Sequence, residues 1–437
     1  MTRRAWPHES NLIEGGVVEG ELLVGVDWDS RGYEVCLLNT DGQVLQDVRV
    51  DHQAESVAEF IADLLQRVRG DSTRIVVGIE TPRGALVEGL LEQQIAVHAI
   101  NPKQFDRLRD RHRVSGAKDD PVDAFILGDS LRHDRHLFHH VQPDHPLVIE
   151  LREVVRADEE LGQEFIRLSN RLREQLHRTH PHLLQLGSDL TDRWVWDLVE
   201  TLLLSNRPRT RLRDLTRLLE QYRIRRLQAE DVLRIIEQPA LRVSPGTTNA
   251  VRVQLSLLLP RLRLVEEQRR SCAQRMKQLL EAYGQETSSG KVQEPSTLEI
   301  LDSLPGIGLR VCSTMIAEAS HQLASPEAAR YLRSYGGAAP VTRRSGKRVL
   351  VLRRYACNQR LQNAFFHWSR TSIQRDPHAR AHYAAQRARG HSHGRALRSV
   401  TDRWLRILCA MLETRTLYDP SRLKIAKQPP VEIPEAA

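Results

Sequence analysis

The stretch VGVDWDS, residues 24–30, decides how the first part of this sequence is read. Val24 and Val26 are typical strand residues, and Asp27 falls where that strand is expected to end. A carboxylate at the carboxyl end of a buried strand points into the crevice where α/β proteins bind ligands. The alternative is a plain turn, because Asp29 and the serine after it are turn formers. Taken alone, the stretch favours the turn, and only its surroundings favour a site.

The surrounding segments predict three antiparallel strands, then helix, strand, helix, strand and helix. The strands are LLVGVDW, YEVCLLN, VLQDVRV, RIVVGIETP and AVHAIN, and the helices include SVAEFIADLLQRV and DDPVDAFILGDSLRHD. This is the ribonuclease H-like order, in which the first and fourth strands are neighbours about 4.8 Å apart. If both strands end at equal depth, Asp27 and Glu80 lie side by side at the ends of these two strands.

Asp120 and Asp123 are three residues apart at the start of a predicted helix, so they share one face of it. Four carboxylates can therefore converge, and convergence raises their pKa values unless a cation neutralises them. Mg²⁺ or Mn²⁺ with oxygen ligands does this, and two such ions can hold both reacting oxygens of a phosphodiester. The alternative for each acid alone is a surface charge or a helix cap, as for Asp119 and Asp120.

The length and the net charge of the chain limit the expected number of domains and the class of partner. The chain has 437 residues, which predicts two or three domains, and a net charge of +8 carried mostly by clustered arginines. Arginine matches phosphate geometry, so nucleic acid is the favoured partner, with a solvated basic surface as the alternative. Five scattered cysteines without metal-ligand spacing predict a reducing cytoplasm and no zinc site. We expect no secretion signal, no membrane span, a flexible lead-in over 1–20 and a disordered tail over 421–437.

Between the predicted sheet domain (21–142) and the C-terminal region, residues 143–290 read as a helical arm. Long amphipathic stretches near heptad spacing, one broken at His180–Pro181 and one at about 251–283, flank a smaller helical insert. We expect Pro260 to kink or restart the second helix. The arm is read either as a coiled coil for self-association or for spanning nucleic acid, or as a spacer.

The C-terminal region, 291–420, opens with Leu-Pro-Gly-Ile-Gly between two apolar helices. This is a helix–hairpin–helix signature, in which Gly306 and Gly308 let backbone N–H groups approach a phosphate, or an ordinary tight turn. Farther on, Ser345 stands in a basic loop and could attack a phosphodiester with cations stabilising the charge. On spacing alone a simple turn serine is favoured. The expected phosphate contacts are Arg343, Arg344, Gly346, Lys347, Lys118, Gly306 and Gly308.

Together these motifs resemble the DEDD transposases of the insertion sequence 110 family, the bridge-RNA-guided recombinases. GVDWDS, GIETP and KDDPVDA carry the family's four acids, here Asp27, Glu80, Asp120 and Asp123. LPGIG, YGGAAP and the following Ser-Gly match its C-terminal transposase domain, with Ser345 at the nucleophile position. The order and spacing of the pieces make the resemblance specific over residues 22–418.

The resemblance implies an α/β plus all-α protein. It implies a ribonuclease H-like (RuvC-like) domain, a coiled-coil arm, and a helical transposase domain bearing the nucleophilic serine. It also implies donor and target DNA, a structured noncoding guide RNA, and dimers or tetramers in which the acids of one protomer meet the serine of another. The expected activity is RNA-guided, metal-assisted strand exchange through a phosphoserine, in the cytoplasm at the nucleoid. The alternatives are a metal-dependent nuclease or junction resolvase that uses the acids alone, and a non-catalytic nucleic-acid-binding protein.

Overall fold

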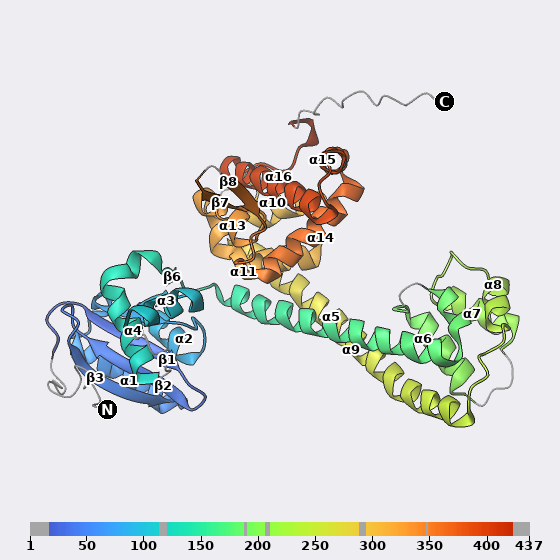
Figure 1. Ribbon diagram of the computed structural model, residues 1–437, viewed down its shortest axis with the longest axis horizontal. Helices are drawn as coiled ribbons and strands as arrows, with labels where there is room; N and C mark the ends of the chain where they lie inside the picture. Colours follow the sequence, from blue (N-terminus) through green and yellow to red (C-terminus); the bar gives the residue numbers. More distant parts are fainter. Residues whose placement is uncertain are drawn as a thin grey trace. The chain divides into compact units, whose positions relative to one another are not determined.

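The computed structural model describes residues 17–112, 120–187, 190–205, 210–287, 294–346 and 348–422. The chain divides into two compact units, here called the sheet unit (Met1–Asp144) and the helical unit (His145–Ala437). Figure 1 shows the elements of each unit. The predicted arm (143–290) and the predicted C-terminal domain (291–420) both fall within the helical unit, apart from the first residues of the arm. The expected lead-in up to residue 16 and the expected tail from 423 lie outside the described residues.

The sheet unit alternates strands and helices as the sequence predicted, with one further strand. Its elements are β1 (Leu22–Trp28), β2 (Gly32–Leu38), β3 (Val44–Asp51), α1 (Ala54–Arg67), β4 (Ile75–Ile79), α2 (Ala85–Glu92), β5 (Ala96–Ala99), α3 (Pro102–His112), α4 (Asp120–Asp134) and β6 (His139–Val141).

The strand order of the sheet is β3-β2-β1-β4-β5-β6. β1 pairs antiparallel with β2 and parallel with β4, so the predicted neighbours of β1 and its antiparallel pairing with β2 are confirmed. β6 was not predicted. It has the sequence His-His-Val and is mostly exposed, so it carries none of the apolar alternation by which strands are found.

Alternating residues of β1 face two different hydrophobic cores. Val24 and Val26 belong to the core that also holds residues of α1 and α2, while Leu23 belongs to the core around α3 and α4. Gly25 and Asp27 share the face of Leu23 because side chains alternate along a strand. Asp27 therefore points to the side of the sheet that α4 covers.

Three glycines, here called the glycine seat, let α4 lie directly on the sheet. Gly25 and Gly78 are paired in register on β1 and β4, and Gly128 faces them from α4. A Cβ at Gly25 would lie 1.9 Å from the carbonyl oxygen of Ala124 and 2.4 Å from the amide of Gly128. No side chain fits there, so the close approach of backbones requires glycine. This contact brings the first turn of α4 to the end of β1.

Two long helices, α5 (Pro146–Thr179) and α9 (Pro245–Thr287), pack along each other in the helical unit. α5 ends just before Pro181, as predicted. α9 is longer than predicted at both ends and continues through Pro260 as one helix, so the expected restart there is wrong. The insert between them, α6 (Arg193–Leu203), α7 (Leu212–Gln221) and α8 (Ala229–Ile236), shares a core with parts of α5 and α9, in which Trp194 and Trp196 are almost completely buried.

The C-terminal part of this unit contains seven helices and one β-hairpin among the described residues. They are α10 (Thr297–Ser303), α11 (Leu309–Ala324), α12 (Pro326–Ala329), α13 (Leu332–Tyr335), β7 (Val341–Ser345), β8 (Arg348–Leu352), α14 (Gln359–Arg375), α15 (Pro377–Ala388) and α16 (His393–Thr414). Its core includes residues of α5 and α9, so these two long helices pack with the C-terminal helices.

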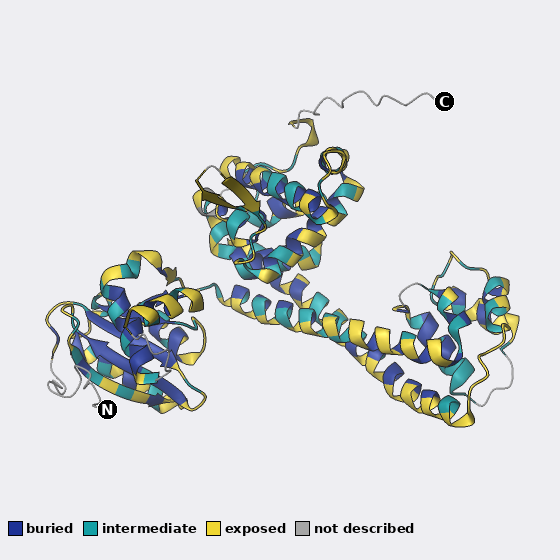
Figure 2. Ribbon diagram, in the orientation of Figure 1, coloured by how far each residue is buried: buried dark blue, intermediate teal, exposed yellow. Residues whose placement is uncertain are grey.

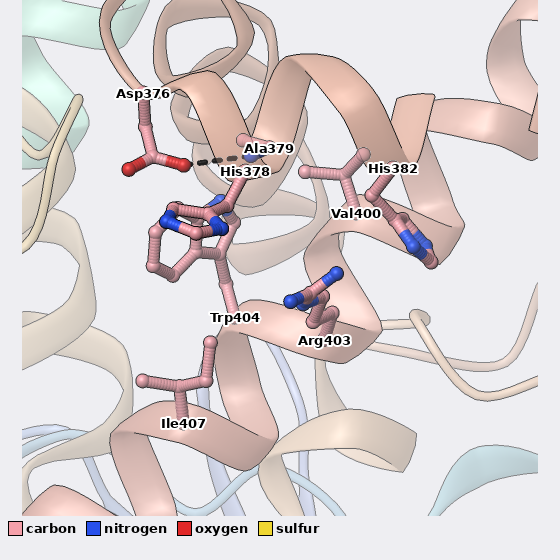
Figure 3. Close-up of a pocket in the computed structure, with 8 residues that line it drawn as sticks. All are labelled: Asp376, His378, Ala379, His382, Val400, Arg403, Trp404 and Ile407. Carbon is pink, nitrogen blue, oxygen red and sulfur yellow. Dashed lines mark hydrogen bonds between the residues drawn. The ribbon is translucent and has the colours of Figure 1, made fainter. Parts of the chain in front are cut away.

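A small cavity between α15 and α16 is a packing feature (Figure 3). Its volume of about 10 Å³ is room for about one water molecule. Asp376 beside it caps α15, because its Oδ1 accepts a hydrogen bond of 2.6 Å from the amide of Ala379. Among the described helices of the whole chain, none is long and apolar enough to cross a membrane.

Candidate functional site

Three of the four predicted acids lie together at the end of β1. Asp27, Asp120 and Asp123 each offer a carboxylate oxygen, and these atoms lie within 4.8 Å of one another. We call these three residues the acid cluster. Asp27 and Asp123 are 8% and 1% exposed, whereas Asp120 is half-buried. Asp120 and Asp123 occupy the first turn of α4, where the helix dipole favours negative charge.

Glu80 follows β4 directly and lies outside the acid cluster as the structure describes it. The ladder between β1 and β4 ends with Val26 opposite Ile79, so Glu80 is the next residue level with Asp27. It is half-buried and within electrostatic reach of Arg109. The register thus agrees with the predicted neighbourhood of Asp27 and Glu80, although the carboxylate of Glu80 does not join the other three.

Asp29 is a turn former, which was the alternative interpretation of the opening stretch. Its Oδ1 accepts a hydrogen bond of 2.6 Å from the amide of Ser30, and its own amide donates to the carbonyl of Gly32. Asp29 therefore makes the turn between β1 and β2. Of the two carboxylates in the opening stretch, Asp27 lies in the acid cluster and Asp29 forms a turn.

Arg109 on α3 holds the most buried acid, and no sequence pattern predicted it. Its Nε and Nη2 donate to the two carboxylate oxygens of Asp123 at 2.9 and 2.7 Å, and its guanidinium lies 4.6 Å from the ring centre of Phe105. Hydrogen bonding to Asp123 raises the pKa of Arg109 above its ordinary value, with the nearby charges of Asp123, Asp106 and Glu80 adding to it. A fork-to-fork pair of this kind is both strong and directional.

The donor set of the acid cluster fits a hard divalent cation. Carboxylate oxygens are the ligands that Mg²⁺ and Mn²⁺ prefer, and three of them converge here. Converging carboxylates need cations close by, and Arg109 is one of these. Asp27, Asp120 and Asp123 would hold such an ion, with Arg109 competing for Asp123.

The sequence predicted that Ser345 lies in a loop, whereas it is the last residue of β7 in the β7–β8 hairpin. The alternation of Val-Thr-Arg-Arg-Ser and the β-branched Arg-Val-Leu-Val-Leu favours paired strands, and this signal was overlooked in the sequence. Gly346 takes the turn position, with φ +54°. Ser345 and its neighbours are exposed, so its hydroxyl is open to a large ligand.

The hairpin register sorts the basic residues by face. Ser345 pairs with Arg348, and Arg343 pairs with Leu350. Because side chains alternate along a strand, Arg343 and Arg348 share the face of Ser345, whereas Arg344 lies on the opposite face. Arg348 was not among the predicted contacts, although the strand alternation contains the signal. The predicted contacts Lys118 and Lys347 lie outside the described residues.

The two glycines of the Leu-Pro-Gly-Ile-Gly turn differ in surroundings. Gly306 is buried with φ +91°, and a Cβ there would lie 2.7 Å from the amide nitrogen of Ser372 on α14. Glycine is thus required by helix packing at this position. Gly308 is exposed, with open space around its Cα, and its surroundings are compatible with a phosphate contact.

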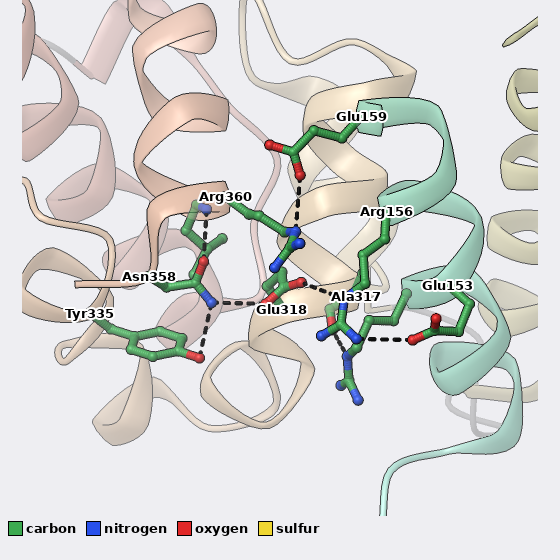
Figure 4. A network of polar contacts seen from close by, with 10 residues as sticks. Glu153, Arg156, Glu159, Ala317, Glu318, Tyr335, Asn358 and Arg360 are labelled. Carbon is green, nitrogen blue, oxygen red and sulfur yellow. Dashed lines mark hydrogen bonds and ion pairs between the residues drawn. The ribbon is translucent and has the colours of Figure 1, made fainter. Parts of the chain in front are cut away.

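A polar network fixes the segment after the hairpin to α5 and α11 (Figure 4). Asn358 caps α14 by accepting from the amide of Leu361 at 3.1 Å, and its Nδ2 donates to Glu318 at 2.8 Å. Arg360 reaches back to Glu159 of α5 at 2.9 Å. The exposed hairpin therefore stands on a firmly connected base.

Comparisons with known proteins match both site regions. The family described as a transposase, of the DEDD IS110 type, matches residues 24–181, and the family described as "Transposase IS116/IS110/IS902 family" matches residues 298–384. The acid cluster and Glu80 lie in the first match and Ser345 in the second.

Relatives from insertion elements or named as transposases are found in several bacteria. "Putative transposase y4uE" of Sinorhizobium fredii is 41% identical over 52% of this chain and 64% of its own length, slightly under two thirds. "Mini-circle putative transposase for IS117" of Streptomyces coelicolor is 29% identical over 92% of this chain and 96% of its own. The 43.6 kDa protein of insertion element IS110 from the same organism is 30% identical over 69% of this chain and 72% of its own. With both halves matched in order, the chain belongs to the IS110 family of transposases.

Proposed function

We propose that the chain is an RNA-guided, site-specific DNA recombinase that joins strands through a phosphoserine at Ser345. The observation that carries this proposal is an exposed serine on a basic hairpin, together with a separate acid cluster suited to a divalent metal. A metal nuclease needs only the acids, whereas the serine and its flanking arginines have a use in strand transfer. The relatives named as transposases support DNA strand transfer, and the guide RNA is what the resemblance to the family implies.

In the proposed step the Oγ of Ser345 attacks a DNA phosphorus atom. An Oγ–P ester forms and the bond from phosphorus to one sugar oxygen breaks, while the serine proton is lost and the leaving oxygen gains one. The phosphodiester energy is conserved, so the reverse attack by a new strand end rejoins DNA. Arg343 and Arg348, on the face of Ser345, would stabilise the charge that develops on the phosphate.

The acid cluster would serve the same reaction with the metal bound. A divalent ion supplies charge neutralisation and polarises a phosphodiester oxygen. Asp27, Asp120 and Asp123 would hold the ion, with Glu80 completing the set of four, and Arg109 would compete with the ion for Asp123. Strand exchange should therefore stop on chelation and in Asp120→Ala.

The test is a denaturing gel of labelled DNA carrying the ends of the element. The wild type should give a protein-linked, protease-sensitive band that Ser345→Ala lacks, while the variant still binds DNA. Thr342→Ala is the matched control, because Thr342 is an exposed hydroxyl on the other face of the same strand. Free nicked DNA from wild type and Ser345→Ala alike would replace the proposal by a metal-dependent nuclease or junction resolvase.

Guide RNA and self-association are part of the proposal. The purified protein should carry one discrete RNA, held with strong salt dependence because many phosphates are neutralised. Ribonuclease treatment should stop recombination, and the complex with RNA and DNA should sediment as a dimer or tetramer. Recovery of mixed host RNA with unaffected recombination would contradict RNA guidance.

A further inference from the structure

A cavity of about 180 Å³ opens beside the base of the β7–β8 hairpin. Its wall combines the backbone of Gly336 and Gly337, before the hairpin, with Arg353, directly after β8, and Arg398 of α16. The cavity is far larger than the one-water cavity near Asp376. Among the described residues that line it, none is an aspartate or a glutamate. We call it the arginine cavity.

Arg398 is a half-buried cation in surroundings that repel it. Burial lowers its pKa below the ordinary arginine value, and the charges of Arg353 and Arg395 lower it further. Among the described residues, none of these three arginines forms an ion pair with a carboxylate. Arg353 and Arg395 are exposed, whereas Arg398 is half-buried, and a half-buried cation beside two like charges is unfavourable unless an anion joins it. The charge distribution therefore calls for an anionic ligand.

The other groups of the cavity suit a nucleotide. Arg353 is held in place by a hydrogen bond of 2.9 Å to Gln362 and by the ring of Tyr355, 5.2 Å from its guanidinium carbon. Phe366, at the rim, is 40% exposed, and exposed aromatic rings are where bases of single strands stack. Asn363 adds an amide to the same lining.

We infer that the arginine cavity binds a backbone phosphate of a nucleic-acid strand, with Arg353 and Arg398 as its donors and Phe366 beneath the adjoining base. This inference rests on the proposed function, in which the hairpin contacts nucleic acid. β8 has five residues, so its length at about 3.4 Å per residue is roughly 17 Å. That span equals about five nucleotide steps of a duplex, and one strand can reach both Ser345 and the cavity.

The test compares Arg398→Gln and Arg353→Gln with Arg375→Gln, an exposed arginine at the end of α14 outside the cavity. Binding is measured by fluorescence anisotropy against salt, with oligothymidylate, oligouridylate of equal length, and a random duplex as probes. Each cavity variant should weaken binding about 10-fold or more, as expected for a charged hydrogen bond. Each should also lower the salt slope by about one phosphate, roughly 0.7 to 0.9. The Arg375→Gln values should stay within about threefold of the wild type.

The three probes distinguish the sources of the phosphate. A loss confined to oligouridylate assigns the cavity to RNA, and a loss on oligothymidylate or duplex assigns it to DNA. Thermal unfolding adds a second readout: Arg398→Gln should keep or raise the midpoint, because a repelled cation is removed and no ion pair is lost. Wild-type slopes on all probes for both cavity variants would overturn the inference. A reduced slope with no serine-linked band would contradict only the proposed serine chemistry.

Discussion

The acid cluster and the β7–β8 hairpin differ in burial: the first lies on a buried, well-packed frame and the second is exposed. In Figure 2 the central strands of the sheet unit are almost wholly buried, whereas the hairpin is exposed. Asp123 is fixed from two sides, by its helix on the glycine seat and by Arg109. Ser345 stands on two five-residue strands with no buried face.

This difference teaches what each region contributes. Repelling carboxylates can be held together only by a rigid, well-packed frame, which the sheet supplies before any ligand binds. A two-stranded hairpin is marginally stable by itself, so its final geometry depends on what it binds. We therefore expect substitutions in the sheet unit to act through the fold, and those in the hairpin to act through the ligand.

The largest contrast should come from the same substitution at two glycines. Gly25→Ala places a Cβ against the backbone of α4, where neither partner can move aside, and should cost at least about 3 kcal/mol. Gly346→Ala meets no atom within 4 Å and carries only the strain of φ +54°, about 1 kcal/mol. Hydrogen exchange with mass spectrometry should show loss of protection over residues 22–38 for the first variant only.

An equal, local effect of the two substitutions would contradict the contrast between rigid frame and open hairpin. Gly308→Ala serves as the control, since the φ of Gly308 is −115° and a Cβ added there would meet no atom within 4 Å. It should be indistinguishable from the wild type in exchange.

The second contrast lies within the hairpin. Arg348→Gln removes the cation opposite Ser345 and should lower the yield of protein-linked DNA by about 100-fold, the order expected for one lost electrostatic donor. Arg344→Gln removes a cation from the opposite face and should change the yield less than about threefold beyond its general effect on DNA binding. Equal losses would show that the hairpin acts as a basic patch without regard to face.

The sequence predicted the sheet well because strand order and the positions of acids at strand ends follow from local pattern. It did not predict Arg109, because a bidentate partner on another helix leaves no periodic signal. It did not predict the glycine seat, since three glycines far apart in the chain make it. The hairpin was missed for a different reason: Gly346 and the basic residues suggested a loop and hid the β-branched alternation. The features that were not predicted depend mainly on contacts between residues far apart in the chain, which local sequence preferences do not reveal.

The third prediction concerns Arg109 as a competitor for the metal. Arg109→Gln leaves both oxygens of Asp123 available to a cation and should tighten Mn²⁺ binding about 10-fold, measured by calorimetry. Without metal the variant should be less stable by about 3 kcal/mol, because a buried carboxylate loses its partner. Added Mn²⁺ should restore the lost stability.

Arg111→Gln is the matched control for this prediction. Arg111 lies on the same helix, and its pair with Asp134 at 3.2 Å is solvent-exposed on the arginine side. Loss of such a pair should cost under about 1 kcal/mol and leave Mn²⁺ binding unchanged. Weaker Mn²⁺ binding in Arg109→Gln would instead show that Arg109 supports the ligand geometry of Asp123.

The smallest expected effect is a pH dependence confined to the sheet unit. Burial lowers the pKa of His98 on β5 to about 4, from 6.5, and the electrostatic influence of His140, Arg135 and His139 around it acts in the same direction. Its ring stacks on His140 at 5.1 Å between ring centres, and its buried Nδ1 finds no hydrogen-bond partner in the described part of the chain. His98 is therefore neutral in the folded state.

The sign of this effect follows from proton binding. Between about pH 4 and 6.5 the unfolded chain takes up a proton at His98 that the folded chain does not, so stability falls as the pH falls through this range and is full above it. His98→Asn should flatten that part of the curve in urea unfolding measured at each pH, whereas His136→Asn, at an exposed position nearby, should leave it unchanged. An unaltered slope in His98→Asn would mean that the strand edge opens to water and lets His98 charge. In that case the rigid frame would end before β5, and the contrast with the hairpin would be limited to β1, β4 and α4.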